Sequence, residues 1–351
     1  MVKQNREARS EIGNDLKTMQ AEKIQINWHP GLSIYASEPF LKTVSDEYGW
    51  VGGINESGKL LCVLPYSVLR KSIFRLIRFP VQTIFWGEEL DVEKERSFLN
   101  TAVEYFRSTG ADLIIPATFN TVFRTCPDGA TVAPFGSYIV DLRHPEETLW
   151  NNLHSKHRNV IRNAMKKGVK ILSGREQLET VYRLVGDSFR RSARGFIGRM
   201  RIGFRMDYEA FKRQVLAFGE NVKIFIAEYE GIVQGCAVIP FSDHSAYYMH
   251  GGSIPSPLTG ATNLLQWEAI RQFRELGVRF YDFFGARIEP EKGSKIEGII
   301  KFKERFGGKF IQGYMWKYPF HPLKYFFYTL AARLRSNGDV VDQERHKLPQ
   351  A

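Results

Sequence analysis

The sequence predicts an α/β protein with two lobes, each built from a mixed sheet flanked by helices. Three observations indicate this fold class. Segments with strand-like and helix-like apolar patterns alternate along most of the chain. The 351 residues exceed what one ordinary core needs and are enough for two lobes. A hydrophobic fraction of 43%, with 26 Phe, 15 Tyr and 6 Trp, is typical of a globular protein.

The first half contains a loose succession of strands and helices. We expect a helix over 40–49, a hairpin of strands 50–54 and 60–69 around the turn NESGK, a helix over 93–110, and a strand over 112–117. Gly110 is suited to end the second of these helices, because glycine adopts the left-handed cap conformation. Residues 118–136 are rich in loop formers, and we place the domain boundary at their end.

The second half shows a clearer order. It predicts a strand over 137–142, a long helix over 145–168, a strand over 169–173, helices over 176–193 and 207–219, a hairpin over 221–241, a strand over 244–253, a helix over 259–277, a strand over 278–285, a short helix ending within 303–307, and a strand over 309–318. The order β-α-α-β-β-β-α-β-α-β is the layout of acyl-CoA N-acyltransferases of the GNAT type. We therefore expect GNAT-like lobes over 22–135 and 136–320, followed by a C-terminal helix and tail over 321–351, with 336–351 frayed.

The charge balance favours anionic partners. Lys and Arg number 49 against 38 Asp and Glu, a formal net charge of +11. Nucleic acid, a phosphorylated substrate and an acidic membrane surface are all compatible with such a surface. The stretch "HPLKYFFYTLAARLR", 321–335, is short, aromatic and basic. It fits either a packing helix or a helix that lies on an anionic membrane.

Cysteine usage and apolar runs point to the cytoplasm. Cys62, Cys126 and Cys236 are far apart, which fits reduced thiols, and no CxxC metal spacing occurs. The polar N-terminus has no apolar segment of a secretion signal. No apolar run reaches the roughly 18–20 residues of a spanning helix. We expect a cytoplasmic protein and leave open a peripheral contact with the inner membrane face.

Two segments are candidates for binding phosphate. Thr259 and Gly260 open the helix over 259–277, and the free amides of a helix N-terminus attract anions; alternatively, Thr259 is an ordinary N-cap. Arg158, Arg162 and Lys166 recur every fourth residue and align on one helix face. This basic stripe is either a phosphate contact or a solvated surface.

An arginine-rich loop follows the helix over 176–193. The sequence "RRSARGFIGRMRIGFRM" combines six arginines, among them Arg199, with three glycines. Arginine forms forked hydrogen bonds to phosphate oxygens, and glycine allows the loop to bend. The loop is either a lid over a diphosphate-bearing acceptor or a surface loop.

Tyr248 and His250 are candidates for an acyl pocket. Alternation along "AYYMHGGS" places both side chains on one face of a strand. His250 is also a candidate general base. The alternative is that both are ordinary core side chains.

The segment "YDFFG" and the closing "KFKERFGG" carry the strongest candidates. Asp282 lies among aromatics and must be hydrogen-bonded or paired, and it is a candidate to orient a substrate amine. Phe302 and Phe306 are one helical turn apart and are expected to anchor the helix in the core. Lys303 would then sit at the rim of a cleft, where its ammonium could stabilise the oxyanion formed when an amine attacks an ester.

Other reaction classes lack their motifs. The sequence has no GxSxG elbow, HExxH pair or Walker loop, and no zinc spacing. We expect neither a metal nor a tightly bound cofactor. The reaction would be one that positioning and electrostatics can drive, such as acyl transfer from an activated ester.

Three motifs together resemble the FemABX family of peptidoglycan bridge-forming aminoacyltransferases. They are "KHRNVIRNAMKKGVKI", "ATNLLQWEAIRQFRELGVRFYDFFGA" and "GIIKFKERFGGKFIQGY", and "EPFLKTVSDEYGW" with "GKLLCVLPYSVL" is similar too. The resemblance covers roughly residues 30–320. It implies two GNAT-like lobes, and it places the family's functional phenylalanine and lysine at Phe302 and Lys303. The paired-helix arm of several staphylococcal-type members is absent.

The resemblance implies aminoacyl-tRNA as the donor and an amine of a nucleotide- or lipid-linked envelope precursor as the acceptor. Two alternatives stay open. One is an acyl-CoA-dependent N-acyltransferase that acts on an amino sugar in surface polysaccharide biosynthesis. The other is a protein that binds tRNA or membrane without catalysis.

Overall fold

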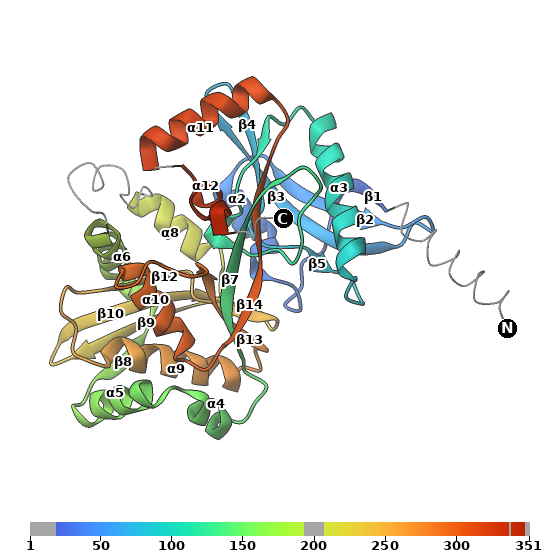
Figure 1. Ribbon diagram of the computed structural model, residues 1–351. Helices are drawn as coiled ribbons and strands as arrows, with labels where there is room; N and C mark the ends of the chain where they lie inside the picture. The colour runs from blue at the N-terminus through green and yellow to red at the C-terminus, as the bar shows by residue number, and fades with distance from the viewer. Residues whose placement is uncertain (1–18, 193–206, 337, 348–351) are drawn as a thin grey trace. The chain divides into compact units, whose positions relative to one another are not determined.

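A computed structural model describes residues 19–192, 207–336 and 338–347 (Figure 1). The described chain divides into two compact units. The first comprises the residues up to Asn27, Val44–Phe135 and those from Gln312 onward, and the second comprises Trp28–Thr43 and Gly136–Ile311. The units are therefore not contiguous in sequence, unlike the expected lobes. Residues 28–43 join the second unit, and the C-terminal residues return to the first.

The first unit is built on one mixed sheet. Its strand order is β1 (Gln20–Ile24), β2 (Tyr48–Ile54), β3 (Leu60–Lys71), β4 (Phe74–Arg78), β6 (Leu113–Ile114) and β14 (Lys309–Pro319), with β5 (Ile84–Phe85) paired to β3. The expected hairpin forms because Asn55 accepts a hydrogen bond from the Lys59 amide and Gly58 takes a φ of +77°. Strand β4 was not predicted.

Helix α3 (Val92–Ser108) covers part of this sheet and packs against β1 and β2. Asp91 caps its N-terminus by accepting a hydrogen bond from the Lys94 amide, and Gly110 follows its C-terminus with a φ of +74°. Its buried face includes Phe98, Leu99, Ala102, Val103 and Phe106. The three- and four-residue spacing of these side chains explains why the helix was predicted correctly.

The second unit contains a four-stranded antiparallel sheet and a separate three-stranded ladder. The sheet has the order β12 (His250–Ser253), β10 (Ile232–Pro240), β9 (Val222–Tyr229) and β8 (Lys170–Ser173). The ladder consists of β7 (Thr131–Asp141), β13 (Phe280–Ala286) and β11 (Ser245–Tyr247), in that order. Strand β7 begins inside the segment expected to be loop and passes from the first unit to the second.

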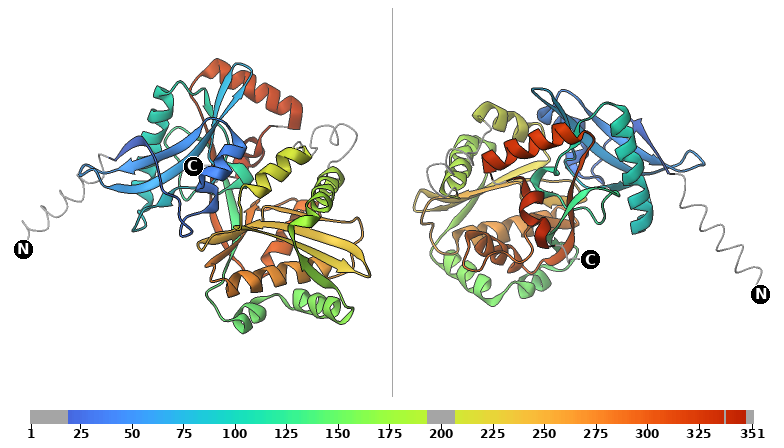
Figure 2. Two further views of the ribbon diagram at one scale, coloured as in Figure 1. Left: turned by 180° about the vertical axis from the view of Figure 1, so that it is seen from behind. Right: turned by 45° about the horizontal axis from the view of Figure 1, so that its top comes forward.

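Helices cover both faces of the four-stranded sheet (Figures 1 and 2). On one face α9 (Ala261–Glu275) packs on β9 and β10, with α5 (Ser155–Lys166) against it. On the other face lie α6 (Leu178–Ser192) and α8 (Tyr208–Leu216). Side chains of β10 show the two sides, since Gly235 faces Thr262 of α9 and Cys236 faces Val181 of α6. The expected α/β fold with mixed sheets flanked by helices is confirmed.

The predicted long helix over 145–168 is two helices. Helix α4 (Glu146–Asn152) ends before Leu153 and His154, which are extended, and α5 begins at Ser155. His154 acts as the N-cap of α5, because its Nδ1 accepts a hydrogen bond from the Lys156 amide. The helical spacing of apolar residues continues across the break between α4 and α5, so the sequence pattern did not indicate the break.

The expectation of a frayed tail is wrong for residues 338–347. Helix α11 (Pro322–Ser336) is followed by α12 (Val340–Glu344), which begins with a capping box of Asp339 and Asp342. Both carboxylates pair with the fully buried ammonium of Lys317, at 2.9 and 2.7 Å. Val341 is also fully buried. No helix among the described residues combines the length and apolar character needed to cross a bilayer.

Candidate active site

A bulge in β13 is the centre of the candidate site. Asp282 pairs with Ile139 of β7 and Gly285 pairs with Ser137, so two residues of β13 lie opposite one of β7. Phe284, the second of these two residues, has a φ of +54°, which is uncommon for a residue other than glycine. Such bulges bend a strand and redirect its side chains and carbonyls. Strained backbone of this kind is a reason to look for function.

Asp282 holds the bulge from inside. Its Oδ1 accepts hydrogen bonds from the Ser137 hydroxyl at 2.5 Å and from the Phe284 amide at 2.7 Å. Burial raises the pKa of the Asp282 carboxyl, while these two hydrogen bonds and the positive charge of Lys303 oppose that rise. The carboxylate is therefore hydrogen-bonded, as a buried acidic group must be. Ser137 was not recognised from the sequence, since a lone serine in a strand carries no signal.

Lys303 holds the bulge from the other side. The residue belongs to α10 (Lys295–Glu304), and its Nζ donates hydrogen bonds to the carbonyls of Phe284 at 2.7 Å and Gly285 at 2.9 Å. Burial lowers the pKa of its ammonium to about 8, although the negative charge of Asp282 acts in the opposite direction. The two carbonyls belong to the bulge and to the residue after it, and the ammonium gives each of them a hydrogen bond.

The expected position of Lys303 at a cleft rim is wrong, because only 9% of its surface is exposed. Phe306, three residues later and just beyond the end of α10, is also buried, at 1% exposed. Phe302 is partly buried, with its ring 5.1 Å from that of Phe306 and 5.5 Å from that of His157. Lys301, by contrast, is exposed and pairs with Glu297 at 2.7 Å.

An aromatic wall adjoins the bulge. Phe284 stacks on Tyr247, with ring centroids 5.3 Å apart and planes at 21°. Tyr35 packs edge-on against Tyr247 at 4.9 Å, and the Tyr247 hydroxyl donates to Ser33 at 2.9 Å. Burial raises the pKa of Tyr247 to about 12. The bulge thus turns Phe284 toward a buried tyrosine pair, and nothing in the sequence near Tyr35 indicated this neighbour.

The chain changes sheets between Tyr247 and His250. The Tyr248 amide donates to the Asp282 carbonyl at 2.9 Å, whereas the Met249 amide donates to the Val238 carbonyl of β10 at 3.1 Å. The predicted single strand over 244–253 is therefore β11 in one sheet and β12 in the other. The pairing of β13 with β11 ends at Asp282, just before the bulge.

Tyr248 and His250 consequently do not share one strand face. The Tyr248 ring packs 6.1 Å from Phe283, while the His250 ring lies 5.5 Å from Phe211 of α8. Burial lowers the pKa of His250 to about 4, so the ring is neutral at pH 7 and weakly basic. This argues against His250 as the general base.

The N-terminus of α9 is shaped by helix packing. Gly260, and not Thr259, is the N-cap, with a φ of +90° and no side-chain cap. A Cβ at Gly260 would lie 2.1 Å from the Val160 carbonyl of α5, so glycine is required for the close approach of these helices. Thr259 is exposed. Phosphate binding at this terminus remains a prediction.

The basic stripe of α5 is partly used locally. Arg158 donates hydrogen bonds to the carbonyls of Asn151, at 2.7 Å, and of Leu153. The Arg162 guanidinium lies 5.2 Å above the Trp150 ring. Both arginines therefore hold the corner between α4 and α5. Arg199 lies outside the described residues.

Comparisons with known proteins agree with this architecture. A family model described as an acetyltransferase (GNAT) domain matches residues 155–293. Lipid II:glycine glycyltransferases from two strains of Staphylococcus epidermidis are each 33% identical over 82 residues, 23% of this chain. The match spans about a fifth of the length of these curated relatives, 20%.

Solved structures share the fold over most of the chain. A crystal structure of FemX gives a TM-score of 0.63 at 15% identity, covering 87% of this chain and 99% of that one. A protein of unknown function from Bacteroides thetaiotaomicron gives 0.50 at 9% identity, covering 87% and 95%. The resemblance carried by the three motifs is confirmed. Residues 155–293 thus match a GNAT acetyltransferase domain, and the chain shares the fold of FemX.

Proposed function

We propose that this protein is an aminoacyltransferase that moves an aminoacyl group from aminoacyl-tRNA to an amine of a peptidoglycan or other cell-envelope precursor. The acceptor would carry phosphate, in a nucleotide- or lipid-linked form. The similarity to lipid II:glycine glycyltransferases supports this substrate class. The observation that carries the chemistry is the buried ammonium of Lys303 at the bulge of β13.

Lys303 has one donor left for the reaction. An ammonium has three N–H groups. Two donate to the carbonyls of Phe284 and Gly285, and the described residues offer no acceptor for the third. A pKa of about 8 keeps most Lys303 side chains charged at neutral pH. When an amine attacks the ester carbonyl, negative charge forms on its oxygen, and a preoriented cation in a dry site stabilises it.

Asp282 would orient the attacking amine. Its Oδ1 is occupied by Ser137 and Phe284, whereas no hydrogen bond to Oδ2 occurs within the described part of the chain. Oδ2 can therefore accept an N–H of a neutral amine and aim its lone pair at the ester. As the new C–N bond forms and the ester C–O bond breaks, the proton of the amine would pass through a substrate phosphate to the ribose oxygen of the departing tRNA. Phe302 would act indirectly, by fixing the helix turn that carries Lys303.

The proposed phosphate and acyl contacts stay predictions. They are Arg158, Arg162, Arg199, Tyr248, His250, Thr259 and Gly260. Among those that the structure describes, Arg162 and Thr259 are exposed.

A CoA-dependent N-acyltransferase that acts on an amino sugar is the second candidate. The match of residues 155–293 to an acetyltransferase domain favours it. The two functions differ in the donor, since a thioester releases free thiol and an aminoacyl ester releases uncharged tRNA.

The decisive assay supplies purified protein with charged tRNA and a muropeptide precursor. The proposal expects a mass increase of one aminoacyl residue on the acceptor, which ribonuclease treatment abolishes and acetyl-CoA cannot replace. Thiol release from acetyl-CoA in the presence of an amino sugar would favour the second candidate. Envelope precursors that accumulate in cells without the protein, measured by mass spectrometry, would identify the acceptor.

A further inference from the structure

Helix α11 presents an apolar face to solvent. We call the five side chains on this side the outer face: Leu323, Phe326, Phe327, Leu330 and Leu334. Their exposed fractions are 77, 61, 55, 43 and 65%. The spacing of three and four residues places them in one stripe along the helix. Large apolar side chains gathered in this way mark an interaction surface.

The opposite side of α11 already has its own packing. Tyr325 and Tyr328 pack against the buried cluster of Leu76, Leu113 and Ile115. The outer face therefore contributes nothing to the core of the first unit. A helix that is apolar on both sides is expected to be covered on both.

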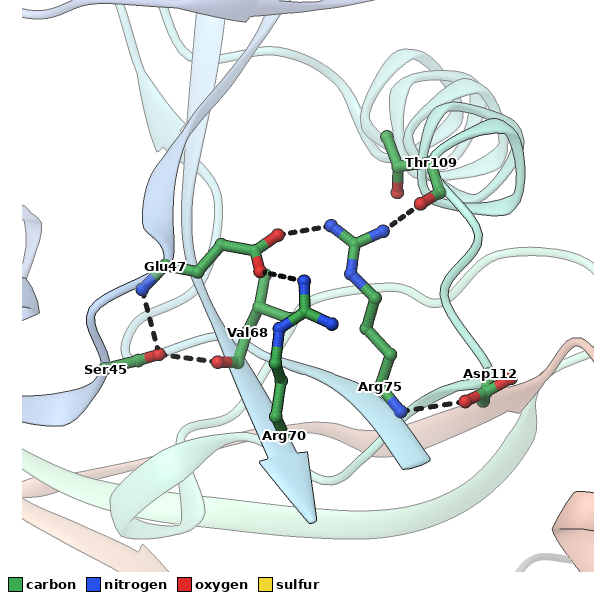
Figure 3. Close-up of polar contacts among 7 residues, drawn as sticks. All are labelled: Ser45, Glu47, Val68, Arg70, Arg75, Thr109 and Asp112. Atoms are coloured by element: carbon green, nitrogen blue, oxygen red, sulfur yellow. Dashed lines mark hydrogen bonds and ion pairs between the residues drawn. The ribbon is translucent and has the colours of Figure 1, made fainter. Parts of the chain in front are cut away.

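Polar contacts fix the outward orientation of α11. The Lys324 ammonium pairs with Asp112 at 2.6 Å and lies 3.4 Å from the Ile73 carbonyl. Asp112 also accepts a hydrogen bond from the Arg75 amide at 2.7 Å, within the network that Figure 3 shows around Glu47. Ile73, at the turn between β3 and β4, is 67% exposed and adjoins this end of the helix.

We propose that the outer face of α11 inserts into the interface of an anionic lipid bilayer. Burial of the apolar side chains of the outer face in the bilayer interface favours binding, and the positive charge around the helix favours anionic headgroups over neutral ones. Helix α11 contains Lys324 and Arg333 and no acidic residue, and Arg70 and Lys71 end the adjacent strand β3. Lys324 pairs with Asp112, and Arg70 pairs with Glu47. The charge complementarity is therefore carried by Arg333 and the net charge of +11. A second copy of the chain would oppose like charges across the contact, whereas anionic headgroups complement them.

This inference rests on the proposed function, because membrane binding would serve the transfer to a lipid-linked acceptor. A protein held at the membrane surface could reach a lipid-linked acceptor, while binding to lipid does not itself require catalysis. The two can therefore be tested apart.

The test is flotation of the full chain with vesicles. We expect partition into vesicles of phosphatidylglycerol and phosphatidylcholine at least about tenfold above partition into phosphatidylcholine alone. The double substitution Phe326→Ser with Phe327→Ser should lower partition about tenfold or more, because two aromatic side chains no longer enter the interface. Ile232→Ser is the matched control, since Ile232 is as exposed as Phe326, 61%, and lies at the start of β10, outside α11.

Each outcome decides the inference. Absence of vesicle binding by the wild-type chain, or equal binding by the double variant with an unchanged melting temperature, overturns it. A concentration-dependent dimer that the double variant abolishes would identify a second copy as the occupant and also overturn it. Transfer to a soluble precursor without vesicle binding would support the proposed function and overturn the membrane inference. Vesicle binding without any transfer would leave only the membrane inference.

Discussion

The ammonium of Lys303 lies 2.7 Å from the carbonyl oxygen of Phe284, the residue of β13 with a φ of +54°. One hydrogen bond thus connects the functional lysine implied by the family resemblance to the most distorted residue of the strand. Asp282 holds the amide of the same residue. The amide and the carbonyl of Phe284 are therefore both hydrogen-bonded, the first to Asp282 and the second to Lys303. The bulge fixes the positions of these two charged side chains, and they in turn stabilise the bulge.

Lys303→Met should lower turnover by about 100-fold or more and leave a folded protein. Methionine keeps the length of the side chain but removes the cation that would stabilise the oxyanion. It also leaves the carbonyls of Phe284 and Gly285 without a donor, which costs roughly 1–3 kcal/mol of unfolding free energy. Transfer kinetics and urea unfolding measure the two effects separately.

Lys301→Met is the control for this substitution. Lys301 is exposed and pairs with Glu297 on the outer side of the same helix. Its replacement should change stability by less than about 0.5 kcal/mol and leave turnover near the wild-type rate. If Lys303→Met transfers at the wild-type rate, Lys303 has no part in the mechanism and serves only to hold the bulge.

Wild-type stability should rise with pH relative to Lys303→Met between about pH 8 and pH 10. The pKa of Lys303 is about 8 in the folded chain, against an ordinary 10.5. In this window the unfolded chain binds a proton that the folded chain does not, so raising the pH favours folding. A neutral amine still has two N–H groups for the two carbonyls.

The expected gain for the wild type is on the order of 1–3 kcal/mol across this window. Urea midpoints measured for both proteins at several pH values test it. A constant difference would show that Lys303 keeps an ordinary pKa and is solvated.

The identity of these site residues could be predicted, but their geometry could not. Asp282 among aromatics had to be hydrogen-bonded, and Lys303 was marked by the resemblance. The bulge was invisible because it depends on the register between β13 and β7, which lie far apart in sequence. Without the bulge there was no reason to bury an ammonium, so Lys303 was expected at a rim.

Gly260→Ala should destabilise the protein by about 3 kcal/mol or more. An alanine there needs a φ of +90°, and its Cβ would lie 2.1 Å from the Val160 carbonyl. Gly277→Ala, at the other end of α9, is the matched control, because it has a similar φ of +78° but open space around it. It should cost about 1 kcal/mol, from backbone strain alone. Thermal unfolding of both variants separates the cost of backbone strain, which both share, from the cost of the steric clash, which only Gly260→Ala has.

The outcome for Gly260→Ala also bears on phosphate binding. If the variant is stable and loses only activity, Gly260 is needed for binding the phosphate, and α5 can shift to make room for the added Cβ.

Fold prediction failed where tertiary contacts override local pattern. The hairpin around Asn55 and the helix that ends at Gly110 were predicted correctly, because their turn and cap residues act locally. The break at Leu153 follows no proline or glycine. The sequence predicts a frayed tail over residues 338–347 because the partner of Asp339 and Asp342, Lys317, lies in a strand distant in sequence. Periodicity and composition carry no record of such a partner.

Helix α12 provides the last prediction, which concerns the buried charge of Lys317. Asp339→Ala with Asp342→Ala should cost about 3–5 kcal/mol, because it leaves a fully buried ammonium unpaired. Lys317→Met should cost less than the double variant, since it removes the ammonium that needs pairing and leaves two carboxylates that are partly exposed, at 14 and 11%. Urea unfolding of the two variants compares them directly. If Lys317→Met lowers the free energy of unfolding more than the double variant does, this expectation is wrong. The two ion pairs of the ammonium would then stabilise the fold by more than burial of its charge costs.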